Sequence, residues 1–184
     1  MVKYYREKDR FEPISEAEVR ELLAVMSDPD HHMAVILAWL TGARICEIVA
    51  FTKGDFQIDD GKMTVILRSR KHGKTGYPSF NITDPFVSEV IAHVLELPVA
   101  GYVLQRRSTR TYQYAIESAN KLRSPEDTSK WLTFHYFRHG RISYLARVLN
   151  ASAEEIKSWT GHRSTAYEAY FQPRRVERFR GKIR

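Results

Sequence analysis

A short β-branched segment interrupts a chain whose apolar residues otherwise recur at helical spacing. MTVILR occupies residues 63–68, and YPSFNI follows at residues 77–82 after the polar turn SRKHGKTG. Two such segments around a glycine-containing turn predict a β-hairpin. FQI at residues 56–58 is a candidate third strand that turns at Asp60-Gly61. We therefore expect a small antiparallel sheet near this point of the chain.

Helices are expected before and after this sheet. Ser15 and Glu18 form a capping box ahead of apolar residues at helical spacing, which predicts a helix over residues 15–26. Periodicity and end signals predict further helices over residues 30–40, 44–51, 85–96, 109–123, 134–149 and 152–160. The fold class is accordingly α+β and mainly helical, with the small antiparallel sheet inserted among the helices of one domain over residues 1–184.

The chain carries an excess of positive charge. Its 184 residues include 29 Lys and Arg against 22 Asp and Glu, which gives a formal net charge of +7. Six of the last eleven residues are Lys or Arg. This excess favours a polyanionic partner, of which nucleic acid is the commonest.

Several classes of protein are disfavoured by what the sequence lacks. It has no apolar run of 18 or more residues, so we expect no membrane span. Its charged and aromatic start has no apolar signal core, which argues against secretion. Cys46 is the one cysteine, so no internal disulfide can form and too few thiols are present for a zinc knuckle. We expect a cytoplasmic protein.

Two arginines occupy positions where a helix disfavours a cation. Arg138 falls within the apolar stripe of its predicted helix, close to the helix start, and Arg44 begins another helix. The stripe consists of Phe134, Phe137, Leu145, Val148 and Leu149, and Arg141 also falls near it. One interpretation is an internal ion pair, with Glu47 as the partner of Arg44. The other interpretation joins both guanidinium groups in a phosphate clamp.

Five motifs, taken in order, resemble the catalytic domain of the tyrosine recombinase family, which includes phage integrases and Xer-like proteins. They are TGARICEIVAF with Arg44, the turn SRKHGKTG with its lysines, HYFRH with His135 and Arg138, GH with His162, and a tyrosine eight residues later. Each motif is weak alone, but the ordered set across residues 41–170 is specific. The family fold is mostly helical, with a small sheet that carries the lysine.

The resemblance implies a site-specific DNA recombinase that cleaves and rejoins DNA through a 3′-phosphotyrosine intermediate, without metal, ATP or another cofactor. Arg44 and Arg138 would hold the non-bridging phosphate oxygens and neutralise the charge of the transition state. His135 and His162 would donate further hydrogen bonds, and His135 is also the candidate base for the tyrosine proton. His139 could suggest a metal pair with His135, but no carboxylate accompanies them, so no metal is expected.

The lysine and the nucleophile implied by the resemblance each have two candidates. Lys71 matches the family spacing and would protonate the leaving 5′-oxygen, with Lys74 as the alternative. Tyr170 is the candidate nucleophile, although it follows His162 at a shorter separation than the family usually has. Tyr167 stands closer still to His162, and we expect it to be a packing residue.

The resemblance also bears on domain organisation and assembly. Residues 1–14 resemble a linker, and the N-terminal DNA-binding domain usual in the family is expected to be absent. Residues 174–184 place Val176, Phe179 and Ile183 at helical spacing, which predicts a basic amphipathic tail helix. Double-stranded DNA is the expected partner, with a homo-oligomer, a tetramer, assembled on it. The tail either docks on a neighbouring subunit, packs on its own chain, or binds phosphates as a disordered segment.

Two rival functions are also compatible with these residues. A type IB topoisomerase would relax supercoils without a specific site or a tetramer. A catalytically silent DNA-binding protein would keep the positive charge but lose a catalytic residue. All six candidates are present in the chain, which disfavours the silent form; they are Arg44, Lys71, His135, Arg138, His162 and Tyr170.

Overall fold

The structure is a computed structural model that describes residues 13–68 and 75–161. Its first helix, α1 (Glu16–Ala24), begins at the predicted capping box. The Glu18 backbone N–H donates to the Ser15 hydroxyl, and the Ser15 backbone N–H donates to the Glu18 carboxylate. The helix ends two residues before the predicted residue 26, in a turn whose last N–H groups bond to Leu22 and Leu23.

Helix α2 (Pro29–Thr41) forms the centre of the molecule. It begins one residue before the predicted start, because the Asp28 carboxylate caps it and Pro29 fits the first helical position. It ends at Thr41, one residue after the predicted end, and is followed by Gly42, whose φ of 64° lies in the left-handed region. The Asp30 carboxylate is buried and accepts a 2.6 Å hydrogen bond from the Tyr112 hydroxyl, which ties α2 to the following helical layer.

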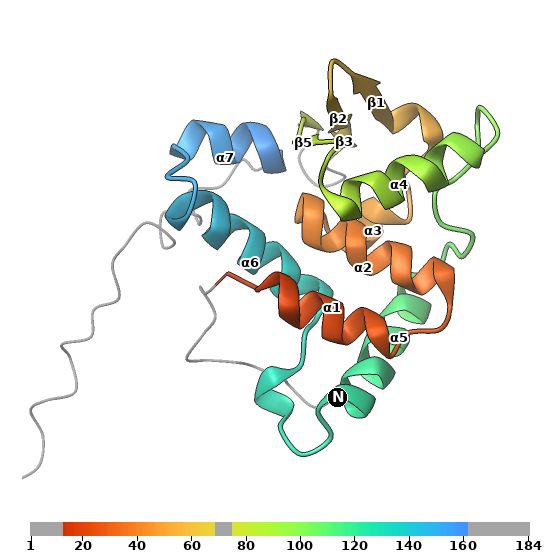
Figure 1. Ribbon diagram of the computed structural model, residues 1–184, viewed down its shortest axis with the longest axis vertical. Helices are drawn as coiled ribbons and strands as arrows, with labels where there is room; N and C mark the ends of the chain where they lie inside the picture. The colour runs from red at the N-terminus through yellow and green to blue at the C-terminus, as the bar shows by residue number, and fades with distance from the viewer. Residues whose placement is uncertain (1–12, 69–74, 162–184) are drawn as a thin grey trace, which may run out of the picture.

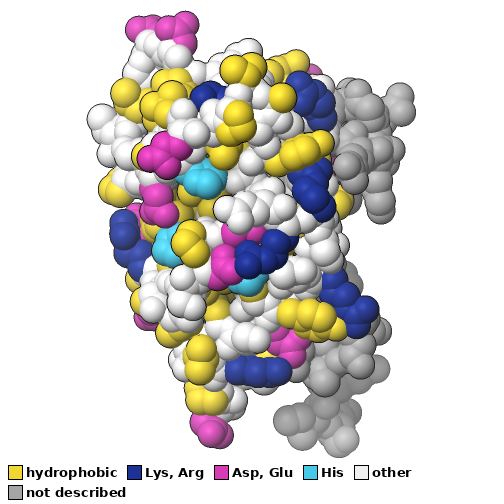
Figure 2. Space-filling view, turned by 90° about the vertical axis from the view of Figure 1, so that its right-hand side faces the viewer, with side chains coloured by type: hydrophobic (Ala, Val, Ile, Leu, Met, Phe, Trp, Pro, Cys, Tyr) yellow, Lys and Arg dark blue, Asp and Glu magenta, His cyan; other side chains and the backbone are white. Residues whose placement is uncertain are grey.

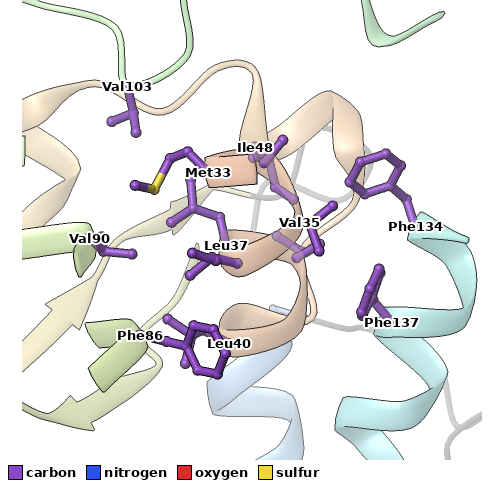
Figure 3. Close-up of a cluster of buried hydrophobic side chains, with 14 of the residues drawn as sticks. Met33, Val35, Leu37, Leu40, Ile48, Phe86, Val90, Val103, Phe134 and Phe137 are labelled. Atoms are coloured by element: carbon purple, nitrogen blue, oxygen red, sulfur yellow. The ribbon is translucent and has the colours of Figure 1, made fainter. Parts of the chain in front are cut away.

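The hydrophobic core surrounds α2. This helix contacts α1, α3 (Ile45–Ile48), α4 (Pro85–Glu96), α5 (Thr109–Arg123) and α6 (Phe134–Arg147). Figure 3 shows side chains of α2 pointing toward α4 on one side and toward α6 on the other. The labelled members are Met33, Val35, Leu37, Leu40, Ile48, Phe86, Val90, Val103, Phe134 and Phe137. Because α2 is apolar on nearly every face, it is enclosed by its neighbours.

The predicted sheet is confirmed, in two pieces. Strands β1 (Phe56–Asp59), β2 (Lys62–Val65) and β5 (Ser79–Asn81) pair antiparallel in the order β1-β2-β5. The short strands β3 (Leu67–Arg68) and β4 (Thr75–Gly76) form a second ladder toward the hairpin turn. The predicted run is interrupted at Ile66, because its N–H donates to the Asp55 carbonyl.

The remaining helices lie close to their predicted bounds. Helices α4 and α5 match them, and α7 (Ala153–Thr160) follows the predicted cap Ser152. Helix α3 is only one turn long, and α6 ends at Arg147 instead of residue 149. The 3-10 turns η1 (Lys53–Asp55) and η2 (Thr128–Lys130) complete the described structure. No helix within residues 13–68 and 75–161 has the length and apolar character to cross a membrane.

The early end of α6 corrects one sequence expectation. Val148 and Leu149, which were expected to lie on the apolar stripe, are 53% and 54% exposed. Both residues follow the last helical residue, Arg147, and Asn150 has a positive φ of 51°. Of the five expected stripe residues, Phe134, Phe137 and Leu145 are buried.

Helix α7 lies beside the sheet, at the end of the molecule away from α5 (Figure 1). The Tyr77 backbone N–H donates a 3.0 Å hydrogen bond to the Ser158 carbonyl. Gly76 permits this approach, because a Cβ there would lie 2.3 Å from the Trp159 carbonyl oxygen. The hairpin and the last turn of α7 are thus fixed against each other, and each leads into a segment that carries predicted catalytic residues.

Candidate functional site

Arg44 lies at the turn between α2 and α3. As the N-cap residue of α3 it has extended backbone, and its own backbone N–H donates a 2.8 Å hydrogen bond to Glu47. Its guanidinium donates a 2.9 Å hydrogen bond to the other oxygen of the same carboxylate. The Arg44 side chain remains 29% exposed, whereas Glu47 is buried. The predicted partner of Arg44 is confirmed, and its guanidinium keeps access to solvent.

Arg138 approaches the same carboxylate from α6. One of its terminal nitrogens donates a 2.7 Å hydrogen bond to the Gly42 carbonyl and lies 3.9 Å from a Glu47 oxygen. Burial is the main reason that the pKa of Arg138 is lowered to about 10, and the charge of Arg44 lowers it further while Glu47 opposes the shift. Arg138 remains a cation at neutral pH. Two arginines nearly one hundred residues apart therefore share one buried anion.

The position of Arg138 in its helix agrees with the prediction. Helix α6 begins at Phe134 after the cap Thr133, so Arg138 is its fifth residue and lies in the second turn. Of the two arginines, Arg44 is the one that lies at a helix start itself, as the N-cap residue of α3. Any anion held here would be bound by the guanidinium groups and not by a helix start at Arg138.

His135 lies in the first turn of α6 and is exposed. Its Nε2 is 2.7 Å from Nε2 of His139, and the two rings meet edge to face with their centroids 4.3 Å apart. His135 also lines an open groove of about 890 Å³ with residues of α5, including Arg110, Tyr114 and Glu117. Among the described residues, no group of three or more His, Cys, Asp or Glu side chains could hold a metal ion.

The other predicted site residues lie outside the described ranges: Lys71, its alternative Lys74, His162, Tyr170 and the packing candidate Tyr167. The structure does describe the points where the chain enters and leaves these segments. Gly161, buried and at a φ of 64°, ends α7 one residue before His162. The Trp159 indole N–H donates to the Thr41 carbonyl at 3.2 Å, which anchors this end of α7 beside the turn that carries Arg44.

Arg141 occupies an aromatic cage one turn beyond Arg138. Its guanidinium carbon lies 5.0 Å from the ring centroid of Trp159, 5.2 Å from Tyr144 and 5.5 Å from Phe80. No carboxylate in the described part of the chain forms an ion pair with it, and burial lowers its pKa to about 10. The cage joins β5, α6 and α7 through one cation.

The start of α5 presents a basic and aromatic surface that the sequence analysis did not single out. The guanidinium carbon of Arg107 lies 3.6 Å from the ring centroid of Tyr102, and Arg110 donates a 2.7 Å hydrogen bond to the Tyr114 hydroxyl. Neither arginine pairs with a carboxylate in the ranges that the structure describes. The spacing of Arg110 and Tyr114, one helical turn apart in RTYQY, was the available signal.

Positive charge is not spread evenly over the surface. On the face shown in Figure 2, acidic side chains lie beside basic ones, and histidines lie between them. Because acidic and basic side chains are mixed there, that face does not present basic side chains alone to a nucleic-acid duplex. Arg107 and Arg110 are therefore the more informative group, because neither pairs with a carboxylate within residues 13–68 and 75–161.

Comparison with known proteins supports the assignment made from the motifs. No family model matches the chain. A curated protein of Sinorhizobium fredii, described as an integrase/recombinase, is 26% identical over 162 residues, which cover 86% of this chain and 62% of that protein. The chain thus spans less than two thirds of this relative.

Solved structures of recombinases share the fold. The XerH site-specific recombinase bound to its difH substrate superposes with a TM-score of 0.65 at 14% identity, over 89% of this chain and 51% of that one. XerA recombinase superposes with a TM-score of 0.64 at 20% identity, over 88% of this chain and 60% of that one. The chain has the fold of a tyrosine recombinase catalytic domain. A lambda integrase dimer bound to a core site also shares this recombinase fold. Its TM-score is 0.61 at 16% identity, over 94% of this chain and 51% of that one.

Proposed function

We propose that this chain is the catalytic domain of a site-specific DNA recombinase or integrase. The observation that carries the proposal is the convergence of Arg44 and Arg138 on Glu47, within the recombinase fold. Two guanidinium groups from separate segments meet beside one anionic position, and Arg44 is partly open to solvent. A phosphodiester that approaches from the open side can be held by both cations, as phosphoryl transfer requires.

The proposed reaction proceeds by direct transesterification. The Tyr170 hydroxyl oxygen forms a bond to phosphorus, and the bond from phosphorus to the 5′-oxygen breaks. His135 accepts the tyrosine proton, and Lys71 donates a proton to the leaving 5′-oxygen. Arg44, Arg138 and His162 stabilise the charge on the non-bridging oxygens.

The product is a 3′-phosphotyrosine link, which a new 5′-hydroxyl can attack in the reverse sense. Each step exchanges one phosphodiester for another of similar energy, so ATP is not required. The guanidinium groups supply the positive charge that phosphoryl transfer otherwise obtains from a metal ion. Lys74 remains the alternative to Lys71 as the proton donor.

Double-stranded DNA is the proposed partner, in a homo-oligomer. The structural relatives include XerH on its DNA substrate and a lambda integrase tetramer on a Holliday junction. Arg107 and Arg110, which pair with no carboxylate in the described part of the chain, suit contact with DNA phosphates. We further propose that the tail helix, residues 174–184, docks on a neighbouring subunit when DNA is bound; packing of the tail on its own chain would leave assembly unchanged when the tail is deleted.

A trapped covalent adduct tests the proposed function. The protein is incubated with a pool of nicked duplexes that carry a randomised segment, so that the short cleaved strand diffuses away and religation is prevented. We expect a protein–DNA adduct that survives denaturant. Binding of the pool without an adduct would identify a silent DNA-binding protein, and relaxation of supercoiled plasmid without recombination would identify a topoisomerase; either result overturns the proposal.

A further inference from the structure

The turn that presents Arg44 is bound by side chains from two other helices. The Gly42 carbonyl accepts the hydrogen bond from Arg138 of α6, 96 residues away in the chain. The Thr41 carbonyl, one residue earlier, accepts a 3.2 Å hydrogen bond from the indole N–H of Trp159 in the last turn of α7, 118 residues away. Two neighbouring carbonyls of one turn are therefore fixed by separate parts of the fold.

The Thr41 carbonyl needs a donor from outside its helix. It belongs to the last residue of α2, and the final carbonyls of a helix have no N–H partner within the helix. Thr41 is fully buried, and its hydroxyl is already used. The hydroxyl donates to the Leu37 carbonyl at 2.6 Å and accepts from the Ala43 N–H at 3.1 Å. Trp159 therefore supplies the donor that this buried carbonyl requires.

Contacts with other elements hold the Trp159 ring in place. The ring meets Phe80 of β5 edge to face, with the centroids 5.2 Å apart and the planes at 84°. The guanidinium carbon of Arg141 lies 5.0 Å from the centroid of the ring. Trp159 also packs against the main core around α2 and against the smaller hydrophobic cluster shared by α6 and α7. The direction of its indole N–H is therefore set by the sheet and by α6, and not by α7 alone.

We propose that Trp159 is a positioning residue for Arg44. The carbonyl that Trp159 binds belongs to the peptide between Thr41 and Gly42, so the indole fixes the plane of this peptide and the direction in which the chain leaves α2. The inference rests on the proposed function, in which the Arg44 guanidinium holds a phosphate oxygen. Two parallel N–H···O bonds to a phosphate need a fixed orientation of the guanidinium. A displacement of about 1 Å can cost roughly 10²-fold in rate.

Trp159→Phe isolates the hydrogen bond to the turn. Phenylalanine keeps an aromatic ring beside Phe80 and Arg141 but has no N–H to donate. Trp39→Phe is the matched control, because Trp39 of α2 is partly buried and meets Phe86 edge to face with the centroids 4.9 Å apart. No hydrogen bond joins the Trp39 indole to another residue within residues 13–68 and 75–161. Both variants lose the same atoms, but Trp159→Phe also loses a bond to the turn.

Hydrogen exchange of the protein without DNA tests whether Trp159 fixes the turn. The backbone N–H groups of Ala43 and Arg44 are both hydrogen bonded and report on the turn, and the N–H of buried Ile36 reports on α2. Local opening accelerates exchange at the turn alone, whereas a general loss of stability accelerates it throughout. In Trp159→Phe we expect exchange at Ala43 and Arg44 to accelerate about fivefold or more relative to Ile36, because one hydrogen bond to the turn is lost. In Trp39→Phe the three rates should keep their ratio. Equal acceleration at all three positions in Trp159→Phe, or none, would overturn the proposal.

Cleavage kinetics measure the consequence for Arg44. The rate of single-turnover adduct formation with the trapped duplexes is compared with DNA affinity from fluorescence anisotropy. We expect Trp159→Phe to slow adduct formation about tenfold or more while DNA affinity changes less than about twofold, because affinity is spread over many phosphate contacts. Trp39→Phe should keep the rate of the unchanged protein. Equal slowing in both variants, or a loss of affinity that matches the loss of rate, would reduce Trp159 to a packing residue.

The positioning role and the proposed function can fail separately. If the unchanged protein forms no adduct, the recombinase reaction is wrong, and hydrogen exchange still decides whether Trp159 holds the turn. If adducts form but Trp159→Phe changes neither the exchange nor the rate, Trp159 has no positioning role and the proposed function stands. Should Trp159→Phe fail to fold, benzothienylalanine at position 159 takes its place, because a sulfur atom replaces the indole N–H in a ring of the same shape. The same two expectations then apply.

Discussion

Arg138 donates a 2.7 Å hydrogen bond to the Gly42 carbonyl, two residues before Arg44 in the chain. Gly42 ends α2 with a positive φ, so the turn that presents Arg44 is held in place by the other arginine. The two candidate phosphate-binding residues are thus coupled through the backbone as well as through Glu47. This coupling makes the geometry of the turn as important as the charges.

Gly42→Ala is expected to destabilise the fold more than Gly61→Ala. Both glycines have a positive φ, 64° and 73°, which costs about 1–2 kcal/mol for alanine. A Cβ at Gly42 would also lie 3.0 Å from Cβ of Arg141, whereas nothing lies within 4 Å at Gly61. Chemical denaturation should show an additional loss of roughly 1–3 kcal/mol for Gly42→Ala. Equal losses would mean that the turn relaxes without strain.

Glu47→Gln is expected to lower the free energy of unfolding by roughly 3 kcal/mol, because it neutralises the buried carboxylate that lies beside the guanidinium groups of Arg44 and Arg138. The matched control is Glu16→Gln, which removes the exposed pair with Arg20 and should cost less than about 1 kcal/mol. Thermal unfolding with and without sulfate measures both. If the two arginines accept an external anion, sulfate should raise the unfolding temperature of Glu47→Gln and leave that of Glu16→Gln unchanged.

Tyr170→Phe is expected to abolish the covalent adduct, because it removes the attacking oxygen and leaves the ring. Tyr167→Phe, the control, should retain adduct formation, since a packing residue does not need its hydroxyl. Denaturing gels with the trapped duplexes distinguish the two variants. Adduct in Tyr170→Phe together with its loss in Tyr167→Phe would reassign the nucleophile.

Arg110→Ala is expected to weaken DNA binding and to make it less dependent on salt. Each phosphate contact contributes about 0.9 to the slope of log affinity against log salt, so the slope should decrease by about one. Lys121→Ala is the control, because Lys121 lies on the same helix but is already paired with Glu117. Fluorescence anisotropy at several salt concentrations measures the slopes. An unchanged slope for Arg110→Ala would remove the start of α5 from the DNA interface.

Arg141→Met is expected to raise the free energy of unfolding by about 1 kcal/mol or more, because an apolar chain of similar length replaces a buried cation that pairs with no carboxylate among the described residues. The folded-state pKa of Arg141, about 10, lies below the ordinary pKa of arginine, so the unfolded chain binds more protons at pH values between the two. The charge therefore costs stability at every pH below about 10, and the cost is relieved only as the pH rises above the folded-state pKa.

Arg141→Ala provides the comparison for Arg141→Met. It removes the charge but leaves space among Phe80, Tyr144 and Trp159, so it should be less stable than Arg141→Met. Denaturant titration of both variants separates packing from charge. A less stable Arg141→Met would show that attraction to the three rings outweighs desolvation of the cation.

Local signals in the sequence predicted most of the secondary structure. The Ser15 and Ser152 caps, the turn at Asp60-Gly61 and the bounds of α4 and α5 all depend on residues within a few positions of one another. Hydrogen bonds over such short separations are decided by local chemistry, which the sequence displays directly. The order of the motifs also predicted the recombinase fold, which the structural comparisons confirm.

Contacts between segments that are distant in the sequence could not be predicted from these local signals. The break at Ile66 depends on the Asp55 carbonyl, and the exposure of Val148 depends on where α6 ends. Helical phase could place Arg138 and Arg141 near one stripe. It could not show that Arg138 bonds to the Gly42 carbonyl, or that Arg141 lies among three aromatic rings. Those surroundings come from other helices and strands.

The sequence by itself determined the residue types, their order and the local elements that carry them, because capping, periodicity and turn formation act over a few residues. Only the tertiary structure decided that Arg44 and Arg138 share Glu47 and that His139 occupies Nε2 of His135. The packing of α6 against α2 sets the first relationship, and the side-chain rotamers on α6 set the second. Neither the packing nor the rotamers can be read from residue spacing alone.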